Sequence, residues 1–407
     1  MTSNDLKSGK VPASMVTDGG AADVSGMENV SPRRTAGPGR GEQVFLSGLR
    51  RGATEPAIKL AVRAAAEAAT DFSWLSKGDA VFIKPSHNSG NPYPATANPA
   101  AIAAIVELLR EKGAGRVVLG DMGGADHVHL SPNALRGSTR RLMEASGMAQ
   151  AAQAAGAELF FFEEAGWDAF HPESPCAGSH WRGPLMMPDI LNEVQHIVLM
   201  PRCARHALAG SSCGLKGAVG YWRLDTRLEF HHDAATLQEK VAEANTVDSL
   251  LGKQRLVVSA ANKILVTYGP DKGRVDEPEE GLVIASKSVV AHDMVCLAWL
   301  LEHWQRVPSS DKTFFKDPYN YQLAVTIGNH YIAGLLGGLL PFFTAQKLTR
   351  NDIASIWQDR VLRRAFEVFG GVPSVSLEEA NAVLSEPVTR RLREATTPPA
   401  ENILTPD

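Results

Sequence analysis

Short apolar runs alternate along the chain with longer stretches in which apolar residues recur at helical spacing. Each run is bounded by glycine, proline or polar residues, which is typical of a buried strand and too short for a helix. Strands that alternate with helices predict an α/β fold of three layers, with a mostly parallel sheet between two layers of helices. The predicted strands are residues 43–47, 80–84, 116–121, 158–163, 196–200, 255–259 and 282–285.

The pattern is most regular over residues 80–121. The strand at 80–84 is followed by a helix for which Asn98 supplies a capping side chain and Pro99 the first position. Apolar residues of this helix recur at i, i+3, i+4 and i+7, and a second strand follows at 116–121. This order predicts a β-α-β unit with two parallel strands. Other predicted helices are residues 56–70, 136–155 and 289–304.

The same pattern divides the chain into four parts. Residues 1–44 contain no aromatic side chain and many small and polar residues, so we expect a disordered arm. Residues 45–305 are predicted to form the α/β domain, and residues 306–395 a mostly helical C-terminal region. Residues 396–407 contain two adjacent prolines and are expected to be a loose tail. The longest apolar stretch, residues 331–343, is shorter than the ~20 residues that a membrane helix needs, so no membrane partner is expected.

Composition narrows the class of protein. The 407 residues are 44% hydrophobic and 21% charged, with a net charge of −4, which is an ordinary globular balance. No stripe of Lys and Arg is interleaved with aromatics, so nucleic acid is not an expected partner. The four cysteines form no C-x-x-C pair, so we expect no iron–sulfur cluster and reduced thiols in a cytoplasmic protein. No particular cofactor is indicated, and a homo-oligomer is compatible with this composition.

Candidate chemistry is concentrated in residues 200–221, directly after a predicted strand. Ligands of open α/β sheets bind at the carboxyl ends of strands, and guanidinium and ammonium groups bind carboxylate or phosphate. Histidine has an ordinary pKa near 6.5 and can act as acid or base beside them. A set of solvated loop cations is the alternative. We predict His206 and Lys216 as catalytic residues, and Arg202, Arg205, Gly210 and Gly214 as ligand-binding residues.

Lys84 and Asp121 end two other predicted strands. Because parallel strands end at the same edge of a sheet, both side chains are expected near the cationic stretch. We therefore predict Lys84 as a catalytic residue and Asp121 as a ligand-binding residue, and we expect either Asp121 or Asp293 to set protonation. A surface lysine whose stem packs against the core is the alternative interpretation of Lys84.

Further candidates lie downstream. His232 and Asp233 are predicted to bind the ligand, although adjacent side chains point in different directions, so either His231 or His232 would be engaged. Asp293 lies in a strongly apolar predicted helix, where an isolated buried charge is costly. We expect Asp293 to cap a backbone group or to pair with a lysine of the site, and we count it among the catalytic residues.

Taken together, these motifs resemble the DUF362 family, bacterial and archaeal proteins named for an unknown function. The resemblance covers roughly residues 45–305. Gly217 stands where the family usually has asparagine, and this sequence lacks the C-terminal ferredoxin-like cysteine cluster of many members. The motifs that carry the resemblance are Ile83-Lys84-Pro85, Thr96 with Asn98-Pro99, Gly120-Asp121, residues 201–206, Gly210, Gly214-Leu215-Lys216 with Gly220, His232-Asp233, Gly269-Pro270 with Gly273, and residues 286–293.

The leading functional expectation is an enzyme that acts on a small anionic metabolite, a carboxylate or a phosphate, by acid–base chemistry. Isomerase- or lyase-type proton transfer suits such a site, because cations stabilise the negative charge of an enolate. The first alternative is a metal-dependent enzyme, with a divalent metal bound by His206, by His231 or His232, and by Asp121 or Asp233. The second is a non-catalytic protein that binds a small anion.

Overall fold

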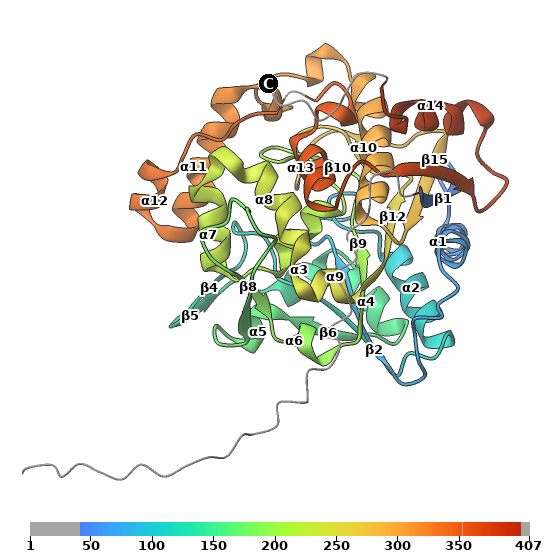
Figure 1. Cartoon of the computed structure of the whole chain (residues 1–407), viewed down its shortest axis with the longest axis horizontal. Helices are drawn as coiled ribbons and strands as arrows, with labels where there is room; N and C mark the ends of the chain where they lie inside the picture. The colour runs from blue at the N-terminus through green and yellow to red at the C-terminus, as the bar shows by residue number, and fades with distance from the viewer. Residues whose placement is uncertain (1–40, 352, 400–407) are drawn as a thin grey trace, which may run out of the picture. The chain divides into compact units, whose positions relative to one another are not determined.

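The computed structural model describes residues 41–351 and 353–399, which are built around an eight-stranded sheet (Figure 1). In spatial order its strands are β16 (Ser374–Glu379), β1 (Gly41–Arg50), β15 (Glu280–Ser286), β12 (Gln254–Ala261), β9 (His196–Met200), β2 (Ala80–Pro85), β3 (Arg116–Asp121) and β6 (Glu158–Phe161). Only β15 runs against the others, since it pairs antiparallel with both of its neighbours and the remaining pairings are parallel. The predicted α/β class with a mostly parallel sheet is confirmed.

Helices cover both faces of this sheet. One face is covered by α1 (Glu55–Ala69), α2 (Pro99–Glu111) and α4 (Met148–Ala154), and the other by α7 (Leu224–His232), α8 (Leu237–Glu243) and α10 (Val289–Gln305). Successive side chains of β2 show why: Val81 and Ile83 pack among the apolar residues of α1, α2 and α4, whereas Phe82 packs in the cluster of the opposite layer. Strands buried on both faces are expected to be continuously apolar, as these are.

Shorter elements connect the layers. The remaining helices before residue 306 are α3 (Thr139–Ala145), α5 (Phe162–Ala165), α6 (Ile190–Glu193) and α9 (Asp248–Lys253). Small sheets are formed by β4 (His129–Ser131) with β5 (Ala134–Arg136), by β7 (Phe170–Glu173) with β8 (Leu185–Pro188), and by β10 (Ala204–His206), β11 (Gly210–Ser212), β13 (Ile264–Leu265) and β14 (Val275–Asp276). The helix predicted over residues 136–155 is two helices, because Gly147 between α3 and α4 has φ +78°.

The C-terminal region carries helices, as the sequence predicted, and one strand that the sequence pattern did not predict. Its helices are α11 (Gln322–Gly337), α12 (Leu339–Thr344), α13 (Arg360–Val368) and α14 (Glu386–Thr396). Between α13 and α14, β16 pairs in parallel with β1 and forms an edge of the main sheet. The sequence of β16 is mostly Ser and Glu, and only Leu377 is buried, so an apolar run could not reveal it.

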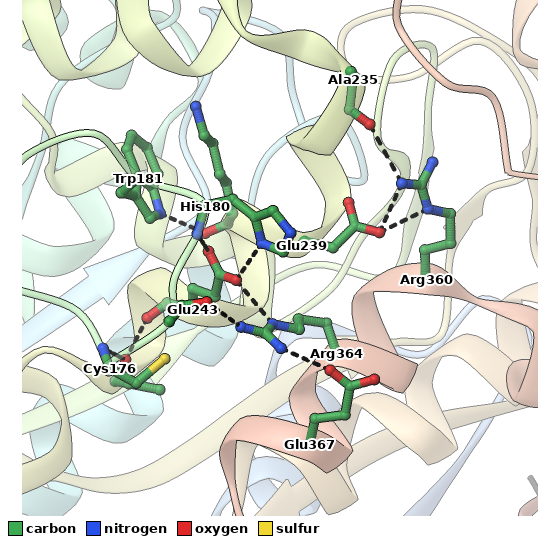
Figure 2. A network of polar contacts seen from close by, with 12 residues as sticks. Cys176, His180, Trp181, Ala235, Glu239, Glu243, Arg360, Arg364 and Glu367 are labelled. Atoms are coloured by element: carbon green, nitrogen blue, oxygen red, sulfur yellow. Dashed lines mark hydrogen bonds and ion pairs between the residues drawn. The ribbon is translucent and has the colours of Figure 1, made fainter. Parts of the chain in front are cut away.

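A network of ion pairs joins this C-terminal region to the α/β domain (Figure 2). The fully buried Glu243 of α8 accepts hydrogen bonds from Arg364 of α13 at 2.8 Å and from His180 at 2.6 Å. One turn earlier on α8, Glu239 accepts a hydrogen bond of 2.7 Å from Arg360. Separating α13 from α8 would leave the Glu243 carboxylate buried without its partner, which is strongly unfavourable. These contacts therefore hold α13 against α8.

Two predicted segments lie largely outside the described residues. Of the arm predicted at residues 1–44, only residues 41–44 are described, and they belong to β1. Of the tail predicted at residues 396–407, residues 396–399 are described. Among the helices of the described residues, none is both long enough and apolar enough to span a bilayer.

Candidate functional site

The carboxyl ends of β2 and β3 bring Lys84 and Asp121 into direct contact. Their Nζ and Oδ1 atoms are 2.9 Å apart, and each side chain is 2% exposed. Asp121 also accepts hydrogen bonds from the backbone N–H groups of His87 and Met122. Burial lowers the pKa of Lys84 and raises that of Asp121, and the attraction between the two charges opposes both shifts. The pair is thus a buried ion pair at the edge of the sheet where ligands of such folds bind.

A glycine lets the backbone of a neighbouring turn pack directly against this ion pair. A Cβ atom on Gly220 would lie 2.4 Å from the Lys84 Nζ and 2.7 Å from Asp121 Oδ1. Gly220 belongs to the 3₁₀ segment η1 (Leu215–Tyr221), which therefore packs its backbone directly on the ion pair. Only glycine fits so close an approach without displacing a charged group.

The same 3₁₀ segment presents Lys216. Asp293 of α10 accepts hydrogen bonds from the backbone N–H groups of Gly214 at 2.6 Å and Leu215 at 2.7 Å, and so fixes the start of the segment. Among the described residues, no group forms a hydrogen bond or ion pair with the Lys216 ammonium. Burial lowers the pKa of Lys216 to about 7, with help from the positive charges of Arg202 and Arg227.

His206 stands beside Lys216 at the end of β10. Its Nδ1 atom accepts hydrogen bonds from the backbone N–H groups of Leu208 and Ala209, both at 3.2 Å. An accepting Nδ1 leaves the proton of the neutral ring on Nε2, which makes Nε2 a donor. Burial, together with the charges of Lys216 and Arg202, lowers the pKa of His206 well below its ordinary value.

Lys216 and His206 line a cavity of about 360 Å³. Arg227 and His231 of α7 also line it, together with Asp126, Asp271 and Lys272, and the Asp271 carboxylate is close enough to oppose the lowering of the Lys216 pKa. Tyr268 and Tyr331 line the cavity and are 37% and 53% exposed, so a ligand can enter beside them. The remaining wall is apolar and comes from the segment after β10, from η1 and from α7, α8 and α11: Leu208, Val219, Phe230, Leu237, Ile332 and Leu336.

Arg227 and His231 were not among the predicted site residues. Arg227 is buried and donates hydrogen bonds to the carbonyl groups of Gly123, Met122, Trp222 and Gly220, so it supplies positive charge from beneath the cavity. Burial lowers the pKa of Arg227 to about 10 and that of His231 to about 4. The i, i+4 spacing of these two residues places them on one face of α7, and that spacing was the available signal.

Arg202 lies behind the cationic side of the cavity. Its guanidinium donates hydrogen bonds to the Ser212 hydroxyl at 3.3 Å and the Pro270 carbonyl at 2.9 Å. Burial lowers the pKa of Arg202 to about 10, and the nearby Asp271 carboxylate opposes that shift. Arg202 therefore joins the turn around Pro270 to the β10–β11 hairpin and adds positive charge behind Lys216.

Several predicted site residues lie elsewhere. Arg205 is buried between the rings of Trp304 and Tyr319, 4.9 and 4.6 Å from their centroids. Gly210 has φ +89° and lets the Tyr319 hydroxyl approach within 2.8 Å of the position of a Cβ atom. Gly214 makes room for the Asp293 carboxylate in the same way, at 2.7 Å. Arg205 and Gly210 thus belong to the contact with the C-terminal region, while Gly214 and Asp293 shape the turn before Lys216.

His232 and Asp233 form a separate group at the end of α7. The His232 Nδ1 atom is 2.9 Å from an Asp233 oxygen, and its Nε2 atom is 3.1 Å from the Thr344 hydroxyl of α12. Asp233 also pairs with Arg182 at 2.6 Å. Of the two adjacent histidines, it is therefore His231 that lines the cavity.

The described residues contain no group of three or more His, Cys, Asp or Glu side chains that could hold a metal ion. The residues named for the metal alternative have other contacts: Asp121 is paired with Lys84, and the Nδ1 atom of His206 accepts backbone N–H groups. All four cysteines are free thiols.

The structure is that of an α/β protein with a cavity lined by positively charged side chains near the carboxyl ends of its parallel strands. Residues 81–298 match the family described as "Domain of unknown function (DUF362)", and the chain belongs to that family. The match includes Lys84, Asp121, His206, Lys216 and Asp293. It ends before the C-terminal region that supplies α11.

Comparison with solved structures finds two similar chains among its matches. One is the lactate racemase apoprotein of Thermoanaerobacterium thermosaccharolyticum, at 13% identity and TM-score 0.38, with 64% of this chain and 56% of that chain covered. The other is the crystal structure of a protein from Thermotoga maritima, at 10% identity and TM-score 0.37, with 64% of this chain and 61% of that chain covered. The aligned part is therefore less than two thirds of either structure. A comparison with curated proteins found no match.

Proposed function

We propose that this protein is an enzyme that binds a small anion, a carboxylate or a phosphate, in the cavity and moves a proton on it. The observation that carries the proposal is Lys216, a cation without a hydrogen bond or ion pair among the described residues, in the wall of a cavity of about 360 Å³. An unpaired ammonium beside two buried guanidinium groups is unfavourable without an anion. The Asp271 carboxylate offsets part of this positive charge, and a bound anion would supply further counter-charge.

Lys216 also has the properties of a general base. With a pKa of about 7, a substantial fraction of its amine is neutral at physiological pH, as proton abstraction requires. In the neutral form Lys216 no longer pairs with the anion, and the positive charges of Arg202 and Arg227 then attract the carboxylate. In a carboxylate substrate, Nζ takes the proton from the carbon next to the carboxylate, and the C–H electron pair moves into the carbon–carbon double bond of the enolate. Return of the proton to the other face gives isomerisation, and loss of a neighbouring leaving group gives elimination.

The surroundings suit the charge that this step creates. The enolate carries one more negative charge than the bound carboxylate, close to the Arg227 and Arg202 guanidinium groups. The Nε2–H of neutral His206 is available as a hydrogen-bond donor in the same wall. Donors and charges that are already in place stabilise a developing anion without reorganisation, which is the largest contribution in many enzymes.

The Lys84–Asp121 pair has a supporting part in this proposal. Lys84 is occupied by Asp121 and by the Pro85 carbonyl, which it meets at 2.9 Å, so it is not a free base. Its charge contributes to the low pKa of Lys216. Lys84 is therefore a positioning residue here, in contrast to its predicted catalytic role.

The test is exchange of carbon-bound hydrogen for deuterium in D2O, followed by proton NMR with butanoate and phenylacetate as probes. We expect the wild-type protein to exchange the hydrogens next to the carboxylate, with a rate that rises with pH through about 7 as Lys216 becomes neutral. The Lys216→Met variant should lose exchange. Lys77→Met is the matched control, because Lys77 is exposed near the amino end of β2, at the opposite edge of the sheet.

Two results contradict the proposal in different ways. If the probes bound without hydrogen exchange, the protein would be a non-catalytic anion-binding protein. If Lys216→Met exchanged hydrogen as fast as the wild type, Lys216 would not be the base. Elemental analysis of untagged protein addresses the metal-dependent alternative, which requires a divalent metal bound in proportion to the chain.

A further inference from the structure

We infer that the anion bound in this cavity carries an apolar body, so that the ligand class is a carboxylate with a hydrocarbon or aromatic group. This inference rests on the proposed function, because it takes the cationic wall as the site of the anion. It adds a statement about the remainder of the ligand, which the apolar lining of the same cavity recognises.

Helix α11 supplies much of the apolar part of the cavity wall. Gly328, Tyr331, Ile332 and Leu336 line the cavity, and their spacing of i, i+3, i+4 and i+8 places them on one face of the helix. In Figure 1, α11 lies against α7, which supplies Phe230 to the same wall. Helices from two different parts of the chain thus present apolar side chains to one space.

No charged side chain interrupts this wall. Residues 322–346, which include all of α11 and α12, contain no Asp, Glu, Lys or Arg. Gly328 brings α11 close to the turn after His206, since a Cβ atom there would lie 3.2 Å from Leu208. The apolar side chains of α11 are therefore packed close to the turn that follows the histidine.

The two walls together select a particular kind of ligand. A small hydrophilic anion such as acetate or inorganic phosphate would satisfy Lys216 and leave the α11 wall in contact with water. An alkyl chain or aromatic ring attached to the carboxylate would cover that wall and gain the free energy of burying apolar surface. Cavities of this size accommodate a whole small ligand, and a few polar groups then fix its orientation.

Titration calorimetry of the full-length protein with acetate, butanoate and hexanoate, at constant ionic strength, tests the inference. We expect each buried methylene to increase affinity about fourfold, and hexanoate to bind up to about 200-fold more tightly than acetate. Ile332→Ser should weaken hexanoate binding by a larger factor than acetate binding. Ile327→Ser is the matched control, because Ile327 is on the same helix, does not line the cavity and is 55% exposed.

The outcomes separate this inference from the proposed function. Suppose that all three carboxylates bind with equal affinity and that Lys216→Met loses binding. This result would overturn the inference that the ligand has an apolar body, and it would support the anion site. The inference would also be overturned if Ile327→Ser abolished the dependence of affinity on carboxylate length and Ile332→Ser did not. That result would place the apolar contact on the outer face of α11. No binding of any carboxylate or of inorganic phosphate would contradict the proposed function itself.

Discussion

The Asp293 carboxylate accepts a hydrogen bond of 2.6 Å from the backbone N–H of Gly214, although helix α10 and the turn before Lys216 are far apart in the sequence. A second hydrogen bond, from the Leu215 N–H, engages its other oxygen. Asp293 thus acts on the cavity through the backbone that carries Lys216. This arrangement explains why a carboxylate persists in a helix that is otherwise almost entirely apolar and buried.

Replacing Asp293 by asparagine should weaken both the fold and the site. The amide has one oxygen for two N–H donors, so at least one buried donor loses its partner, at a cost of about 1–3 kcal/mol in unfolding free energy. Because the turn before Lys216 is no longer fixed, hexanoate binding should weaken as well. Thermal unfolding and calorimetry measure the two effects, with the exposed Asp168→Asn as a control. A variant that loses stability and keeps full affinity would show that Asp293 does not position Lys216.

Lys84 and Lys216 should respond in opposite ways to substitution by methionine. Lys84→Met leaves the Asp121 charge buried and unpaired, and we expect a loss of about 3–5 kcal/mol in unfolding free energy. Lys216→Met removes an unpaired charge from beside other cations, so its stability should equal or exceed that of the wild type. Urea unfolding of both variants measures the difference.

A double variant separates the loss of the ion pair from damage to packing. In Lys84→Met with Asp121→Asn, no buried charge is left unpaired, and the amide oxygen can still accept a backbone N–H. We expect this double variant to recover part of the stability that Lys84→Met loses. If its unfolding free energy is lower than that of the wild type by the sum of the losses of Lys84→Met and Asp121→Asn, the two residues do not act as a pair.

The sequence predicted the strands that position the site, because each is a short run of apolar residues buried on both faces. Strands β3 and β9 lie at the predicted positions, and β2 is one residue longer than predicted. The same reasoning could not find β16, whose side chains are mostly polar and which is identified only by its pairing with β1. Burial on both faces produces a recognisable pattern, whereas an edge strand with an exposed face of Ser and Glu does not.

The sequence located the cationic site more accurately than it located individual side chains. Arg205 and His206 are neighbours in β10, and successive side chains of a strand point to opposite faces. His206 therefore lines the cavity while Arg205 packs against Trp304 and Tyr319. This alternation requires knowing that the segment is a strand, and a run of three residues is too short to give such a signal. The contribution of α11 is likewise tertiary, because it depends on contact with α7.

Gly220 is predicted to be essential for packing. Gly220→Ala places a methyl group 2.4 Å from the Lys84 Nζ, so the ion pair or the 3₁₀ segment must move. We expect urea unfolding to show a loss of about 1–3 kcal/mol in unfolding free energy. Gly252→Ala is the matched control: it lies in helix α9 with nothing within 4 Å of the new methyl group, and should stabilise by up to about 1 kcal/mol. Equal stability of the two variants would show that the backbone accommodates the methyl group freely.

Stability is predicted to fall as the solution is acidified below about pH 6.5. Burial lowers the pKa of both His87 and His231 to about 4, whereas an unfolded histidine titrates near 6.5. Between these values the unfolded chain binds more protons than the folded one, so unfolding free energy rises with pH and is lost as pH decreases towards 4. Each such histidine contributes a slope of about 1.4 kcal/mol per pH unit in that window.

The variant His87→Gln tests this account at a single residue. His87 is 4% exposed and its Nε2 atom is 3.3 Å from the Ser146 hydroxyl, a contact that a glutamine amide can replace. Urea unfolding between pH 4.5 and 6.5 should show a slope lower than that of the wild type by up to about 1.4 kcal/mol per pH unit. An unchanged slope would mean that His87 is protonated in the folded protein. A charged imidazole there would lie close to the positive charges of Lys84 and Arg202, which is the reason to expect the neutral ring.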